Sequence, residues 1–82
     1  MARVPSAPYR VRWTDHALEK ALLLDIPRRD VERAVIERHH TRRRNARPAN
    51  WRVTVNRLVI VYVHPDHRDP STARVVTLWR QR

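Results

Sequence analysis

Six consecutive apolar residues, Leu58–Val63, constrain the fold of this chain more than any other segment. The run is rich in valine and isoleucine, which favour strands over helices, and it is far too short to cross a membrane. A strand that is apolar on both faces is typical of the middle of a sheet, where both faces are covered. The run therefore predicts a central strand, with residues 51–55 and 73–80 as its two neighbours.

Length and the missing residue types exclude several classes of protein. A chain of 82 residues is long enough for one domain and too short for two. Cysteine and glycine are absent, which excludes disulfides, thiolate metal ligands and glycine-rich phosphate loops. Residues 1–8 lack the apolar core of a signal peptide. We therefore expect a soluble cytoplasmic protein with a flexible arm over residues 1–8, one domain over residues 9–82 and no membrane segment.

The positive charge is concentrated in the second half of the chain. The net charge is +10, and residues 38–82 hold eleven arginines against only Asp66 and Asp69. Arginine presents a planar fork of donors that suits phosphate groups. One interpretation is a solubilising surface in a chain from a GC-rich genome. The uneven distribution favours the other, a face that binds a polyanion.

Residues 9–13 alternate as a strand does. Tyr9, Val11 and Trp13 are predicted to point to a buried face, and Arg10 and Arg12 to a basic one. Thr14 then suits the N-cap of a first helix, which ends near Asp25. Its predicted apolar stripe is Ala17, Leu18, Ala21 and Leu22. Pro27 suits the first turn of a second helix, which runs to about Arg38 and buries Val31, Ala34 and Val35. A short edge strand is possible within residues 41–44.

Asn56-Arg57 is predicted to be a two-residue hairpin turn, because asparagine tolerates the positive φ for which glycine is usually used. This turn pairs Val55 with Leu58, and it puts Arg52 and Thr54 on the face opposite the core. The last strand, residues 73–80, allows two orientations. We favour the one with Val76 and Leu78 inward and with Val75, Thr77 and Trp79 outward.

These elements predict an α+β fold with the order β-α-α-β-β-β. A two-helix hairpin packs on one face of an antiparallel sheet, and the other face is open and basic. The open face collects Arg10, Arg12, Arg52, Thr54, Thr77 and Trp79.

Three short motifs resemble a superfamily of small bacterial toxins. They are His16-Ala17 at the first helix, Ile26-Pro27 with Asp30-Val31 at the second, and Val75-Val76-Thr77-Leu78-Trp79-Arg80 at the end. With the element order, they are similar to the RelE/ParE/BrnT-like toxins and to a neighbouring uncharacterised family that has a His-Ala helix start and a terminal Thr-x-Trp/Tyr strand. The resemblance spans residues 9–80.

The resemblance implies a toxin-like protein whose open sheet face grips RNA, including ribosome-bound messenger RNA. In the RelE-like branch the activity is metal-independent RNA cleavage, and in the ParE-like branch the target is DNA gyrase. Such proteins usually pair with a small acidic antitoxin. This chain lacks the lysine-rich first helix common in RelE-like enzymes, so the resemblance does not identify the general base.

RNA cleavage through the ribose 2′-hydroxyl needs a base, and it needs cations that stabilise the phosphorane. His16 is the acid–base candidate, because imidazole titrates near neutrality. Arg52 and Arg80 are the first candidates for the cations, and Thr77 could bond a phosphate oxygen. The predicted RNA-binding residues are the phosphate anchors Arg10 and Arg12, the clamp Arg42, Arg43 and Arg44, and the base-stacking Trp79.

Neither a cofactor nor a metal is expected. His64-x-x-His67 with Asp66 and Asp69 holds possible metal ligands, but their spacing matches no known site. A packed structural role remains the alternative for His16 and Trp79. Three functions therefore stay open, namely an endoribonuclease, a non-catalytic nucleic-acid- or partner-binding module such as an inactivated toxin or phage adaptor, and an inhibitor of a protein target such as gyrase.

Overall fold

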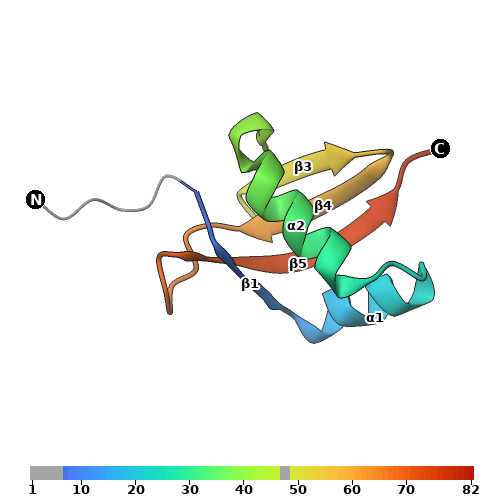
Figure 1. Ribbon diagram of the computed structural model, residues 1–82, viewed down its shortest axis with the longest axis horizontal. Coiled ribbons are helices and arrows are strands. Elements are labelled where there is room, and N and C mark those ends of the chain that lie inside the picture. The colour runs from blue at the N-terminus through green and yellow to red at the C-terminus, as the bar shows by residue number, and fades with distance from the viewer. Residues whose placement is uncertain (1–6, 47–48) are drawn as a thin grey trace, which may run out of the picture.

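The computed structural model describes residues 7–46 and 49–82, which form a five-stranded sheet with two helices on one face (Figure 1). The elements are β1 (Arg10–Trp13), α1 (Asp15–Leu23), α2 (Arg28–Arg38), the 3-10 helix η1 (His39–Thr41), β2 (Arg43–Arg44), β3 (Trp51–Val55), β4 (Leu58–Val63) and β5 (Thr72–Arg80). The strand order is β1-β5-β4-β3-β2. This confirms the predicted α+β class and element order. The prediction of an antiparallel sheet is wrong for the first strand. The sheet is mixed, because β1 pairs in parallel with β5 while the other pairs are antiparallel.

The helices begin and end at the residues that local chemistry favours. The Thr14 hydroxyl accepts a hydrogen bond from the Ala17 N–H at 3.1 Å and so caps α1. At the other end Asp25 has a φ of 56°, where glycine would usually stand. The N–H groups of Asp25 and Ile26 donate to the carbonyls of Leu22 and Ala21. This C-terminal cap turns the chain directly into Pro27, the N-cap of α2.

The hairpin between β3 and β4 has the predicted register. Val55 pairs with Leu58, and the pairing continues to Trp51 opposite Tyr62. Asn56 and Arg57 have φ values of 50° and 69°, as a two-residue turn that matches the twist of the strands requires. The predicted central strand is confirmed, because β4 lies between β3 and β5 and five of its six residues are buried.

The orientation favoured for the last strand is wrong for Val75 and Val76, which point in the opposite directions to those predicted. Val61 pairs with Thr77 and Tyr62 pairs with Val75, so Val76 is an extra residue in β5. Such a β-bulge interrupts the alternation of side chains. Val75 and Leu78 are therefore both in the core, while Val76 packs on the other side of the sheet. The outward positions predicted for Thr77 and Trp79 are unaffected.

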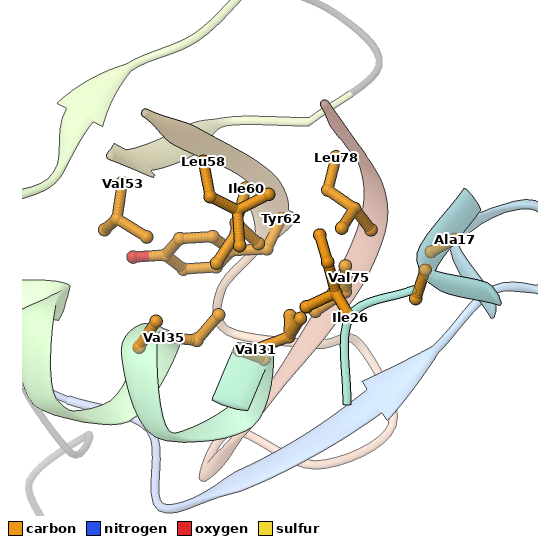
Figure 2. Packing of buried hydrophobic residues seen from close by; sticks show 13 residues of the cluster. Ala17, Ile26, Val31, Val35, Val53, Leu58, Ile60, Tyr62, Val75 and Leu78 are labelled. Carbon is orange, nitrogen blue, oxygen red and sulfur yellow. The ribbon is translucent and has the colours of Figure 1, made fainter. Parts of the chain in front are cut away.

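The core lies between the sheet and the two helices, as Figure 2 shows. Ile60, Tyr62, Val75 and Leu78 are fully buried on the sheet side. Their partners from the helices and the intervening turn are Ala17, Ala21, Ile26, Val31, Ala34 and Val35. Both helices thus cover the same face, with α1 against β5 and α2 against β1 and β3.

Two predicted core positions are on the surface instead. Tyr9 is 62% exposed, because it precedes β1 at the edge of the sheet and its ring lies 5.7 Å from the Arg10 guanidinium. Leu22 is 81% exposed, because the buried stripe of this short helix consists of Ala17 and Ala21 alone.

We call the face of the sheet that points away from the helices the open face. Its strip along β4 is covered, because Val59 and Val61 are only 1% exposed and pack with Ala49 from the loop before β3. The accessible part of the open face is formed by Arg10, Arg12, Arg43, Arg52, Thr54, Arg74, Thr77 and Trp79. The predicted arm falls mostly on residues 1–6, outside the described residues. Within the described ranges, no helix is long and apolar enough to cross a membrane.

Candidate functional site

The start of α1 is tied to the bulge in β5 through Thr14. While its hydroxyl oxygen accepts from Ala17, the same hydroxyl donates to the carbonyl of Val76 at 3.1 Å. The backbone N–H of Thr14 also donates to the carbonyl of Val75 at 3.1 Å. The bulge exposes a carbonyl that a regular strand would use in its ladder, and Thr14 satisfies it. The first turn of α1 is therefore held beside Thr77.

This connection brings together two of the predicted site residues. His16 Nε2 lies 3.2 Å from the Thr77 hydroxyl, although 61 positions separate the two residues in sequence. The His16 side chain is exposed, so the imidazole is accessible to a large ligand. Either tautomer forms the bond, because a hydroxyl can donate to a bare ring nitrogen or accept from a protonated one. A group that can exchange protons therefore stands at the edge of the open face.

A row of cross-strand neighbours leads from Thr77 to two more predicted residues. Val61 pairs with Thr77 on one side and with Arg52 on the other, and Arg52 pairs with Arg43 of β2. Neighbouring strands lie about 4.8 Å apart, so about 10 Å of sheet separates Thr77 from Arg52. No carboxylate of the described residues forms an ion pair with Arg43 or Arg52. Their charges are available to a ligand.

Arg52 and Arg43 line a hollow of about 220 Å³ at this edge of the sheet. Its other lining residues are Arg38 at the end of α2, Thr41 of η1 and Thr54 of β3. Sequence reasoning missed Arg38 and Thr41 as site residues, because no periodicity relates the end of α2 to β3. Alternation in phase with Arg52 already predicts Thr54 on the open face, although not as a site residue.

The predicted anchors Arg10 and Arg12 are paired with Asp69 and Asp66, the two acidic residues of the basic segment 38–82. Arg12 forms an ion pair with Asp66 at 3.2 Å, and Arg10 lies 3.8 Å from Asp69. The Asp66 side chain is completely buried and also contacts His67 at 3.2 Å and Arg74 at 4.0 Å. These arginines therefore organise the 64–72 loop, and the negative charge beside them weakens their attraction for phosphate.

The predicted clamp Arg42, Arg43 and Arg44 is split between two environments. The guanidinium carbons of Arg42 and Arg44 lie 4.2 Å and 5.3 Å from the centre of the Trp51 ring. Both distances are typical of cation–π contacts. Because successive strand residues point to opposite faces, only Arg43 faces the same side as Arg52.

Arg80 and Trp79 lie on opposite faces of β5. Arg80 pairs with the core residue Leu58 and lines a groove beside α2 with Pro27 and Asp30. The structure therefore does not bring Arg80 to Arg52 or His16. Trp79 is 36% exposed on the open face and pairs with Val59. A base that entered this face could reach the indole ring.

The histidines of the considered metal motif are in different environments. His64 is buried against the His39 ring at a centroid distance of 4.9 Å, and burial lowers its pKa from 6.5. His39 Nδ1 in turn lies 2.7 Å from the hydroxyl of Tyr62, whose pKa is raised by burial. His67 is exposed beside Asp66. In the part of the chain that the structure describes, no three His, Asp or Glu side chains are grouped to hold a metal ion.

Asp69 stabilises the 64–72 loop through hydrogen bonds to Ser71 and Thr72. Its carboxylate accepts hydrogen bonds from the backbone N–H and the hydroxyl of Ser71, at 3.0 Å and 2.7 Å, and from the hydroxyl of Thr72 at 3.0 Å. The Ser71 hydroxyl is the main reason that the pKa of Asp69 is lowered.

Comparison with known proteins identifies the fold. No family model and no curated protein sequence matches this chain. Among solved structures, a chain of the toxin–antitoxin complex RelBE2 from Mycobacterium tuberculosis matches with a TM-score of 0.65. The identity is 16%, and the match covers 96% of this chain and 98% of that chain. The predicted resemblance to RelE-like proteins is therefore confirmed at the level of the fold.

Proposed function

We propose that this chain is a toxin-like, RNA-binding protein that cleaves RNA without a metal ion and is held inactive by a small acidic partner protein in the cytoplasm. The observation that supports the proposal most directly is the contact of His16 with Thr77 at the edge of a face on which Arg43 and Arg52 form no ion pair with a described carboxylate. The net charge of +10 favours a polyanionic ligand and an acidic partner.

In the proposed reaction the Nε2–H of His16 donates to the Thr77 hydroxyl, and Nδ1, the ring nitrogen that is left as an acceptor, takes the proton of a ribose 2′-hydroxyl. The 2′-oxygen forms a bond to phosphorus, the bond to the 5′-oxygen breaks, and the departing oxygen takes a proton from water. The products are a 2′,3′-cyclic phosphate and a 5′-hydroxyl end. Thr77 is a positioning residue in this scheme, because its hydroxyl holds the imidazole in place. Arg52 binds a phosphate group of the RNA, and Trp79 stacks on one of its bases.

The structural neighbour supports the proposal that this chain binds a partner protein. That neighbour is part of a toxin–antitoxin complex, and its fold extends over nearly all of this chain. An acidic protein has the charge that complements the basic face of this chain.

Incubation of the purified protein with RNA in EDTA tests the proposal. We expect fragments that end in 2′,3′-cyclic phosphate, and a loss of about 100-fold in cleavage rate for His16→Gln. His40→Gln is the matched control, because His40 is also exposed but belongs to η1. Intact RNA, both with and without ribosomes, would contradict the catalytic part of the proposal.

A non-catalytic RNA-binding protein is the second candidate. The observation that favours it is the position of Arg52, which lines the hollow with Arg38 and Arg43 and stands two strands from Thr77. This candidate predicts tight, salt-sensitive RNA binding without turnover, and binding that His16→Gln leaves unchanged.

A further inference from the structure

We propose that the hollow lined by Arg38, Thr41, Arg43, Arg52 and Thr54 binds a backbone phosphate of single-stranded RNA, away from the His16–Thr77 pair. This inference rests on the proposed RNA-binding function and adds a subsite to it. We call the hollow the phosphate pocket.

The composition of the phosphate pocket fits an anion. It contains three guanidinium groups and two hydroxyls, and none of its lining residues is acidic. Each guanidinium offers five N–H donors in a planar fork, and the Thr54 hydroxyl adds another. All five lining residues are exposed, so a phosphate on a long polymer can enter without displacing any part of the fold.

The cross-strand pair of Arg43 and Arg52 is unfavourable without a ligand. The two residues are direct partners in the β2–β3 ladder, and like charges in this position repel each other. No described carboxylate forms an ion pair with either one. A phosphate between the two side chains would turn this repulsion into two attractions.

The end of α2 is compatible with an anion in spite of its partial negative charge. The Thr41 hydroxyl donates to the carbonyl of Arg38 at 2.7 Å, so this carbonyl does not face the pocket as a bare acceptor. Arg38 also makes no ion pair with a carboxylate of residues 7–46 or 49–82. Its guanidinium can therefore turn toward a phosphate.

The distance from His16 separates the phosphate pocket from the proposed reaction. Thr77 and Arg43 are three strands apart, which corresponds to about 14 Å of sheet. One phosphate group cannot span this gap, so the pocket and the His16–Thr77 pair would hold different phosphates of the same strand. The pocket therefore affects the affinity for RNA and the position in which the RNA strand is bound.

Fluorescence anisotropy with a labelled single-stranded RNA tests the inference, with salt varied from about 50 to 200 mM. The variants are Arg38→Gln and Arg43→Gln, and the matched control is Arg29→Gln, because Arg29 is an exposed α2 residue outside the pocket. We expect each pocket variant to weaken binding several-fold. The slope of log affinity against log salt should become less negative by about 0.7 for each lost phosphate contact.

Two further measurements exclude a merely structural effect. In phosphate-free buffer Arg43→Gln should unfold at a temperature no lower than that of the wild type, because the substitution removes a repulsion. If the protein cleaves RNA, the pocket variants should raise KM and leave kcat unchanged, whereas His16→Gln should lower kcat.

The possible failures are distinguishable. If the wild type binds RNA and the pocket variants behave like Arg29→Gln, the phosphate pocket is wrong and the proposed function stands. If the wild type does not bind RNA under any of these conditions, the proposed function fails and the phosphate pocket fails with it.

Discussion

The two ends of the open face carry the same type of residue in opposite situations. At the β1–β5 end, Arg10 and Arg12 are paired with Asp69 and Asp66. At the β2–β3 end, Arg43 and Arg52 stand directly opposite each other, and no described carboxylate is within ion-pair distance. A count of arginines treats the two ends as equal. The position of two aspartates makes one end a structural element and leaves the arginines of the other end without a described carboxylate partner.

The largest expected effect is a loss of stability at the paired end. Asp66→Asn removes a fully buried charge that contacts Arg12, His67 and Arg74. The loss of the charge-assisted hydrogen bond to the half-exposed Arg12 should lower the free energy of unfolding by about 2 kcal/mol. Urea denaturation measures this change. A loss below about 0.5 kcal/mol would mean that the 64–72 loop holds its shape without the charge.

The second effect concerns RNA affinity at the unpaired end. Arg52→Glu should weaken RNA binding by about 10- to 100-fold, because a phosphate contact is replaced by a repulsion. Arg28→Glu is the control on the helical side, where Arg28 lies 3.7 Å from Glu32. Arg12→Gln should change affinity far less than Arg52→Gln. Equal effects of Arg52→Glu and Arg28→Glu in anisotropy titrations would show that the open face is not the binding face.

A smaller effect should be seen in the pH dependence of stability. Burial lowers the pKa of His64 in the folded state from 6.5, so the unfolded chain takes up a proton at a higher pH than the folded protein. The stability that neutral His64 provides is therefore complete above pH 6.5 and is lost as the pH falls toward the folded-state pKa. Urea denaturation at several pH values should show this decline. In His64→Gln the decline over that interval should be weaker.

The smallest effect is expected for Arg10→Gln. Arg10 and Asp69 are 3.8 Å apart, with Arg10 largely exposed and Asp69 partly exposed, so solvent screens the pair and its loss should change stability little. The pKa of Asp69 should remain low in this variant, because the Ser71 hydroxyl is its main cause and Arg10 the least. A titration of the Asp69 carboxyl by NMR checks this. A return of its pKa to the ordinary value would assign the effect to Arg10 after all.

The parts of the fold that depend on neighbouring residues could be predicted from the sequence. Asn56-Arg57 determines the β3–β4 register, because a two-residue turn leaves one pairing. Thr14 similarly marks the start of α1. The bulge at Val76 could not be predicted, because it depends on a hydroxyl more than sixty positions away. The exposure of Leu22 could not be predicted for the same reason, because it depends on how α1 packs against the sheet.

The candidate site likewise has features that the sequence predicts and features that it does not. Alternation along β3 predicts Arg52 on the open face, where the structure has it. The structure does not place Arg80, the other predicted cation, on that face, because Arg80 pairs with Leu58 and lines the groove beside α2. The pairing of Arg12 with Asp66 and the stacking of Arg42 on Trp51 could not be predicted. Both depend on the way the loops fold back onto the sheet. The roles of the individual residues in binding and catalysis remain predictions.

The hydroxyl of Thr14 limits which residues evolution can accept at this position. It accepts one hydrogen bond from the helix and donates one to the strand, so its single proton has a fixed direction. Serine would preserve both bonds, whereas valine has the same shape and preserves neither. Among relatives of this chain, position 14 should therefore vary between threonine and serine, and a valine there should occur only where β5 has lost its bulge.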